Sequence, residues 1–329
     1  MSNRFRFAGL VENEALKLLR RRRFTVVIAI LGVILCLVAY SQYRQLSRAE
    51  PREWRADIQQ RIANYENRLR RGRISPSWAR SLRAEIVRLQ FYVDHDINPE
   101  NPTAPYFVRG FANAAGFLLL PLLVAVLGSD IVSAEAAEGT DKLLLTRAVR
   151  RWKILASKLA ALFMFTTLTL LAGGLLAYLA SAVVLEPRGW TAPVFSGFEF
   201  SGDVVSFDSV RQLPLWQDTL IAYGLEWYAM LSVASIALLL SVVFRSSSAA
   251  MGTMLASLIG GTILTRISPD WTAGKYLFVS ALPLAEYYTG SAPPYDGMSL
   301  AFCIALLGVW AAGALVIAFA LFTRRDVFG

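Results

Sequence analysis

The chain has 329 residues, of which 55% are hydrophobic and only 17% are charged. A soluble protein would carry about a quarter charged residues, and its apolar residues would be scattered instead of standing in long blocks. These properties exclude a soluble globular protein and predict an all-α integral membrane protein. The formal net charge of +9 is explained by cytoplasmic loops, which accumulate Lys and Arg, so we expect no nucleic-acid partner.

Residue types suited to catalysis or metal binding are scarce in this sequence. Both cysteines, Cys36 and Cys303, lie in apolar blocks, and the single histidine, His95, lies in a polar segment. The sequence has no G-x-x-x-x-G-K-[ST], H-E-x-x-H, G-x-S-x-G or C-x-x-C motif. We therefore expect no catalytic, cofactor-binding or metal-binding residues in this chain, and we do not expect it to be an enzyme.

The first segment, residues 1–23, has the pattern of an amphipathic helix. Phe5 and Phe7 suit a helix that lies in the headgroup layer, so we predict an interfacial helix on the cytoplasmic side. The basic run Arg20–Arg23 then leads into the first span at 24–43. A basic start before an apolar run is also typical of a cleaved signal peptide, but this apolar run is longer than a usual signal-peptide core.

Residues 44–110 form the most distinctive polar insertion. Apolar residues recur every three or four positions within 54–69 and again within 78–93, as on one face of a helix. Gly72 can end the first helix and Pro76 can occupy the first turn of the second. We predict an extracytoplasmic antiparallel helical hairpin, because the first span begins inside. Its many arginines, without a single lysine, reflect either composition or docking to anionic lipid heads or a partner.

Five further stretches are apolar and long enough to cross a hydrocarbon core, which requires roughly 20 residues. Together with the first span they make six predicted transmembrane helices, which places both termini in the cytoplasm. The stretch 276–288 is too short and broken to cross. The remaining predicted boundaries are span 2 at 111–133, a cytoplasmic coupling loop at 134–154, span 3 at 155–185, an extracytoplasmic loop at 186–218, span 4 at 219–244, span 5 at 249–265, an extracytoplasmic or re-entrant segment at 266–298, span 6 at 299–323 and a cytoplasmic tail at 324–329.

Ionisable residues are few within the predicted spans. Glu226 lies about two turns into span 4, and Arg266 ends span 5. Charge inside a membrane is costly, so such residues are candidates for function. For Arg266, a side chain that extends to the headgroups is the better interpretation. Glu226 is a candidate intramembrane polar site, with an interfacial side chain as the equal alternative.

The loop between spans 2 and 3 combines an acidic residue, a Gly-Thr pair, a leucine cluster and basic residues in a defined order. In that order and spacing it resembles the permease subunits of ABC-2 type exporters. Ala148 and Arg150 depart from the family's pattern, which has a proline and a serine there, while Glu14 matches an acid that precedes the first basic run. The matching loop residues are Glu135, Gly139, Thr140, Leu143, Leu144, Leu145, Arg151 and Lys158.

The resemblance implies a division of labour between chains. A separate ABC ATP-binding subunit, which holds ATP and Mg²⁺, would act beneath two permease chains, either a homodimer or a pair with a related permease. The matching loop residues and Glu14 would then couple the permease to the ATPase, with Leu143–Leu145 as the apolar ridge that enters the ATP-binding subunit. The resemblance also implies export of a substrate across a bacterial or archaeal plasma (inner) membrane.

Two other functions stay open at this point. The chain could be a non-transport membrane scaffold that recruits an external partner through the hairpin at 52–95. It could also be a membrane-embedded enzyme, for which Glu226 is the candidate polar residue, although the sequence gives it no evident partner.

Overall fold

A computed structural model provides the structure of the chain. The described part of the chain is mostly helical, at 79%, as expected for an all-α membrane protein. Among the residues that the structure describes, five helices are long and apolar enough to cross a membrane, and a bent pair of helices makes a sixth if it forms a single span. The described residues are 2–20, 22–48, 53–72, 76–99, 101–137, 149–201, 204–206, 210–268, 271–291 and 293–324.

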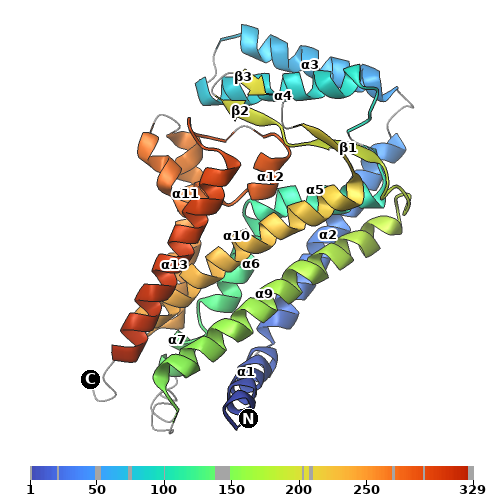
Figure 1. Ribbon diagram of the computed structural model, residues 1–329. Coiled ribbons are helices and arrows are strands. Elements are labelled where there is room, and N and C mark those ends of the chain that lie inside the picture. Colours follow the sequence, from blue (N-terminus) through green and yellow to red (C-terminus); the bar gives the residue numbers. More distant parts are fainter. Residues whose placement is uncertain are drawn as a thin grey trace.

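One long helix, α10 (Leu215–Val243), forms the centre of the molecule (Figure 1). It packs against the long helices α9, α11 and α13, and it also contacts the bent pair α5 and α6. Its buried positions include Ala222, Ala229 and Ala234, all fully buried, and such small residues let neighbouring helices approach closely. The other long helices are α2 (Arg23–Arg48), α9 (Arg151–Ala182), α11 (Ser247–Ile267) and α13 (Leu300–Arg324).

The bent pair consists of α5 (Ala104–Gly116) and α6 (Leu119–Gly128), which meet at an angle of 61°. This differs from the single helix predicted at 111–133. The break leaves Pro121 in the first turn of α6, where a missing N–H leaves no intrahelical hydrogen bond unmade. It also places Gly116 directly against the carboxylate of Glu226, which fills the space that a Cβ atom at position 116 would need.

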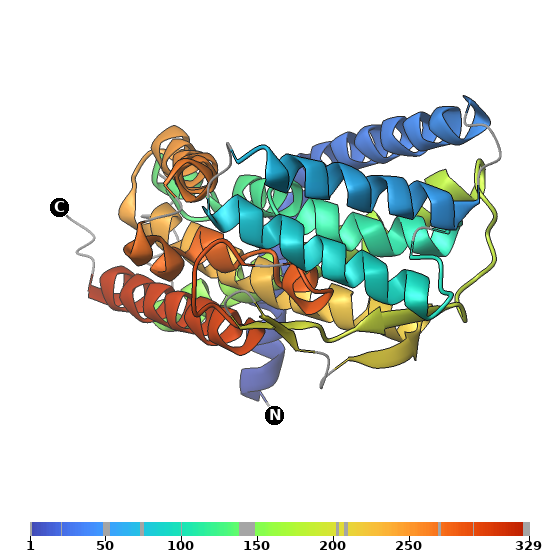
Figure 2. The ribbon, with the colours of Figure 1, turned by 90° about the horizontal axis from the view of Figure 1, so that it is seen from above.

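Two helices, α3 (Trp54–Arg70) and α4 (Pro76–Asp94), lie side by side across one end of the molecule (Figures 1 and 2). They pack through a small core of Ile58, Ile62 and Leu89. The aromatic residues of α4 attach this pair to the rest of the chain: the hydroxyl of Tyr92 donates to the carbonyl of Phe195 at 2.9 Å and accepts from its N–H at 3.2 Å.

The segment after α9 carries short strands in place of a further helix. Antiparallel pairs join β1 to β4 and β2 to β3. The hydroxyl of Ser196 in β1 donates to the carboxylate of Asp218 in α10, which also pairs with Arg109 of α5. The strands are β1 (Pro193–Ser196), β2 (Glu199–Ser201), β3 (Val204–Ser206) and β4 (Arg211–Pro214).

Between α11 and α13 the chain forms short helical segments instead of a span. Leu282, Leu284 and Ala285 in this part are fully buried, so the segment is packed into the protein on the α3–α4 side (Figure 1). The segments are the 3₁₀ helices η1 (Thr272–Tyr276) and η2 (Phe278–Ala281), followed by α12 (Leu284–Tyr288).

The end of the molecule opposite α3 and α4 carries α1 (Ser2–Arg20) and the short helix α7 (Ser133–Ala137) (Figure 1). The last turn of α13 lies toward this end as well. Helix α1 packs against α9 and α2, with Leu18 buried at 4% exposure. This end therefore gathers the N-terminal helix together with the start of α9.

Candidate functional site

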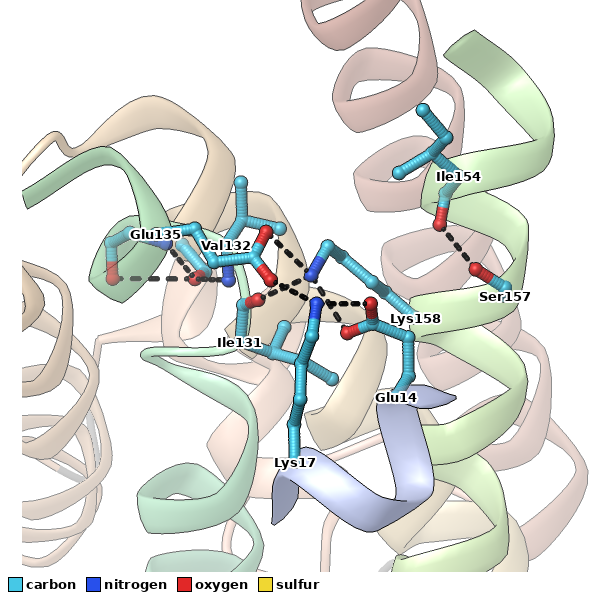
Figure 3. A network of polar contacts seen from close by, with 10 residues as sticks. Glu14, Lys17, Ile131, Val132, Glu135, Ile154, Ser157 and Lys158 are labelled. Atoms are coloured by element: carbon cyan, nitrogen blue, oxygen red, sulfur yellow. Dashed lines mark hydrogen bonds and ion pairs between the residues drawn. The ribbon is translucent and has the colours of Figure 1, made fainter. Parts of the chain in front are cut away.

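Two lysines and two glutamates form a closed network of ion pairs between three elements (Figure 3). Lys158 Nζ of α9 lies 2.8 Å from Glu14 Oε2 of α1 and 2.8 Å from Glu135 Oε2 of α7. Lys17 Nζ of α1 lies 2.7 Å from Glu14 Oε1 and 2.8 Å from Glu135 Oε1. Each carboxylate therefore bridges both lysines.

The local helix geometry explains why these four side chains meet. Glu14 and Lys17 are three residues apart on α1, so they lie on the same face. Lys158 is in the second turn of α9, and its Nζ also donates to the carbonyl of Ile131 at 3.1 Å. That carbonyl belongs to the turn between α6 and α7, so Lys158 binds this turn and both carboxylates together.

The network is largely shielded from solvent. Lys158 is 1% exposed, Glu14 5% and Glu135 7%. Burial alone would lower the pKa of Lys17, but the hydrogen bonds to Glu135 and Glu14 and the negative charges of these two groups together raise it above its usual value. Within the part of the chain that the structure describes, the network pairs two positive groups with two negative groups, and such pairing is the condition under which buried charges are tolerated.

A second set of contacts holds the turn that precedes α7. Arg23 at the start of α2 lies 2.8 Å from Asp130 Oδ2, and Asp130 is 1% exposed. The hydroxyl of Ser241 in α10 accepts from the N–H groups of Val132 and Ser133 at 2.9 and 3.0 Å. The turn at 129–132 is therefore held by α2, α9 and α10.

Three of the residues assigned by resemblance thus come together, because Lys158 pairs with both Glu14 and Glu135. Arg151 lies apart from them, at the first residue of α9, where its guanidinium donates to the carbonyl of Thr323 in α13 at 3.3 Å. The other assigned residues lie outside the described part of the chain: Gly139, Thr140, Leu143, Leu144 and Leu145.

Sequence reasoning missed several members of this site. Lys17 could have been predicted from the sequence, because it follows Glu14 by three residues and therefore lies on the same face of the helix. Asp130 and Ser241 could not have been predicted in this way. Asp130 pairs with Arg23 and Ser241 binds the turn at Val132, and both contacts join positions about 110 residues apart in the chain. These positions come together only because α2 and α10 each pack against the part of the chain around α6 and α7.

Glu226 lies in a different part of the molecule, in contact with α5 and α12. Its side chain is fully buried and does not reach the surface. Its Oε1 accepts from the N–H of Ala285 at 3.4 Å, and its Oε2 has no hydrogen-bond partner among the described residues. Over the same residues, no group of three or more His, Cys, Asp and Glu side chains could hold a metal ion.

A mostly helical chain with several apolar helices of membrane-crossing length is a multi-pass membrane protein. The family model described as ABC-2 family transporter protein matches residues 9–327, nearly the whole chain. The chain therefore belongs to the ABC-2 transporter family.

Two proteins of Bacillus subtilis (strain 168) are similar to it. The uncharacterized protein YhcI is 27% identical over 321 residues, which covers 97% of this chain and 99% of YhcI. The uncharacterized membrane protein YdbK is 28% identical over 214 residues, covering 64% of this chain and 78% of YdbK. The similarity to YhcI spans both the α3–α4 pair and the ion-pair network.

Proposed function

We propose that this chain is the membrane-spanning permease subunit of an ATP-driven exporter. ATP and Mg²⁺ would be bound and hydrolysed by a separate ABC ATP-binding subunit, and this chain would carry no catalytic residue of its own. Two permease chains, identical or related, would form the transport path through a bacterial or archaeal plasma membrane. Membership of the ABC-2 transporter family supports this proposal.

The observation that carries the proposal is the contact between the two sides of the coupling loop. Glu135 stands at the beginning of the predicted loop 134–154 and Lys158 follows its end, yet their charged atoms lie 2.8 Å apart. Both bind Glu14 or Lys17 of α1. A partner that displaces the loop would therefore act at once on α1, α7 and α9, which is what coupling to an ATPase requires.

The proposed orientation follows from the positions of the short basic segments. Lys17, Arg20 and Arg23 lie at the end of the molecule that carries the network, and such residues favour the cytoplasmic side. Six spans, with α5 and α6 counted as one, would place both termini in the cytoplasm. The α3–α4 pair, at the opposite end (Figure 1), would then be extracytoplasmic.

The experiment is gentle purification of the tagged chain from its own host, followed by identification of stoichiometric companions. We expect an ATP-binding subunit that is lost when Leu143–Leu145 are all changed to Ser. The control is Leu46→Ser, an exposed leucine near the opposite end of α2, which should retain the companion. A chain that purifies alone, or only with external proteins, would contradict the permease function.

A non-transport scaffold is the alternative function, and one structural observation supports it. The α3–α4 pair has a small apolar core of its own, separate from the main core. Replacing 54–94 with a short linker distinguishes the two functions. A scaffold would lose its external partner and its role, whereas a permease would keep its ATP-binding subunit.

A further inference from the structure

The α3–α4 pair carries a surplus of positive charge. Residues 54–94 contain nine arginines and four acidic residues. Arg68 and Arg71, at the C-terminal end of α3, are exposed, and their guanidinium groups form no ion pair or hydrogen bond with another residue that the structure describes. Other arginines of the pair are joined to carboxylates: Arg55 to Asp96, Arg70 to Glu66, Arg80 to Asp296 and Arg88 to Glu85.

Arg68 and Arg71 exceed what the end of a helix requires. The unpaired carbonyl groups at a helix C-terminus amount to about −0.5 elementary charge, which basic residues in the last turn offset. Arg68 and Arg71 bring two full positive charges, and Arg70 adds a third that lies 3.5 Å from Glu66. Most of the charge of Arg68 and Arg71 therefore stays available to a ligand.

The side chains around these two arginines form a hollow of about 470 Å³ on one face of α3. Asn64 and Asn67 are exposed there, and each side-chain amide can donate two hydrogen bonds. Residues 64–71 extend about 10 Å along the helix at 1.5 Å per residue, which is longer than one small anion. Among the described residues no acidic side chain lines the hollow, and the lining is Arg61, Asn64, Tyr65, Asn67, Arg68 and Arg71.

The position of α3 favours a ligand in water over the lipid headgroups of the chain's own membrane. Trp216 is exposed in the first turn of α10, and exposed tryptophans mark the level of the headgroups. Helix α3 lies farther out than α10, on the far side of α4 from the long helices (Figure 1). Seen from above, α3 and α4 lie side by side over this end of the molecule (Figure 2).

We propose that the end of α3 binds a water-soluble polyanion with several phosphate groups. The planar guanidinium groups of Arg68 and Arg71 would each bind two oxygens of one phosphate. A phosphate keeps further oxygens for the amides of Asn64 and Asn67, whereas the guanidinium fork engages both oxygens of a carboxylate. The length of the hollow suits successive phosphates of a polymer.

The test is a titration of the purified full-length chain, in a neutral detergent, with short-chain polyphosphate. A fluorescent label on Gln60→Cys, in a background with Cys36→Ala and Cys303→Ala, reports binding locally. Gln60 is exposed and lies one turn before Asn64 on the same face of α3, so polyphosphate bound to basic segments elsewhere leaves the label unaffected. We expect a saturable change in fluorescence.

The double variant Arg68→Gln with Arg71→Gln should weaken this binding more than tenfold, because charge-assisted hydrogen bonds are lost at both positions. The slope of log affinity against log salt concentration should also fall by about 1.4, at about 0.7 for each phosphate contact as in single-stranded nucleic acids. The matched control is Arg44→Gln with Arg55→Gln, which removes the same charge from the end of α2 and the start of α3 and should change the affinity less than threefold.

A second double variant, Arg68→Lys with Arg71→Lys, separates the guanidinium fork from charge alone. It keeps both positive charges but loses the bidentate geometry, so its affinity should lie between those of the wild type and the glutamine variant. All variants must elute as a single species, like the wild type. Equal losses in the glutamine variant and in the control, or full affinity in the lysine variant, would overturn the proposal.

Two competitors identify the kind of anion. Polyglutamate of equal charge should displace polyphosphate only weakly, and dihexanoylphosphatidylglycerol, a water-soluble lipid with an anionic headgroup, should displace it weakly at equal phosphate concentration. Strong displacement by polyglutamate would replace the phosphate ligand with an acidic peptide. Strong displacement by the lipid would replace it with a membrane headgroup.

The site goes beyond the proposed function and does not depend on it, since the titration needs no ATP-binding subunit. Only the place of the ligand outside the cell rests on the proposed orientation. If polyphosphate binds as expected but no ATP-binding subunit co-purifies, the site stands and the permease function falls. If the subunit co-purifies and binding is insensitive to Arg68 and Arg71, only the proposed site falls.

Discussion

Lys158 is a charged residue that the fold buries almost completely, at 1% exposure. Its ammonium group is stabilised by two carboxylates and one carbonyl. Replacing a buried ion pair by apolar residues can be neutral, but removing one partner leaves the other charge without compensation. The network therefore makes the position of α1 relative to α9 depend on single residues.

We expect Lys158→Met to lower stability by about 3–5 kcal/mol, because Glu14 and Glu135 would then face each other with only the partly exposed Lys17 between them. Thermal unfolding of the purified chain measures this change. Lys153→Met, five residues earlier on α9 and only half-buried, is the matched control and should shift the midpoint little. Equal shifts for the two variants would show that the network contributes nothing specific.

Gly116 offers a second test at this scale. A Cβ atom there would overlap the carboxylate of Glu226, so Gly116→Ala should destabilise the chain by about 1–3 kcal/mol, the usual cost of overpacking. Gly110 lies on the same helix with open space around it, and Gly110→Ala should be neutral or slightly stabilising.

Thermal unfolding compares the two glycine variants directly. The double variant Gly116→Ala with Glu226→Ala should recover part of the loss, since it removes the overlapping group. If Gly116→Ala unfolds at the same temperature as Gly110→Ala, the close contact between α5 and Glu226 does not exist in solution.

At the scale of elements, the apolar periodicity located most of the helices but not their breaks. The spacing within 54–69 and 78–93 predicted the helices observed as α3 and α4, because a helical stripe is a local pattern. The bend after Gly116 was not predictable in this way: at the bend Gly116 packs against Glu226, which lies more than 100 residues later in the chain. The ion pair of Asp130 with Arg23 and the hydrogen bonds that Ser241 accepts from Val132 and Ser133 escaped prediction for the same reason.

The α3–α4 pair should open independently of the long helices, because its own core is small. Leu89 is fully buried in that core, and Leu89→Ala should cost about 2–5 kcal/mol. Hydrogen exchange should then become faster in α3 and α4 while α10 keeps its protection. Faster exchange throughout the chain would instead mean that the pair and the long helices unfold as one unit.

For the whole molecule, the decisive property is which end faces the cytoplasm. The ion-pair network and the α3–α4 pair lie at opposite ends (Figure 1), so a coupling site inside the cell and a helical pair outside it require one orientation. In the reverse orientation the α3–α4 pair would face the cytoplasm, and the coupling loop could not meet an ATP-binding subunit there. The short basic segments favour the first arrangement.

Cysteine labelling in intact cells tests this orientation. In a background with Cys36→Ala and Cys303→Ala, we expect Asn64→Cys on α3 to react with a membrane-impermeant maleimide, and Glu12→Cys on α1 to react only after permeabilisation. Both positions are exposed, so a difference in labelling reports the membrane side and not burial. Labelling of Glu12→Cys in intact cells would reverse the topology, and with it the assignment of the loop as the ATPase-facing surface.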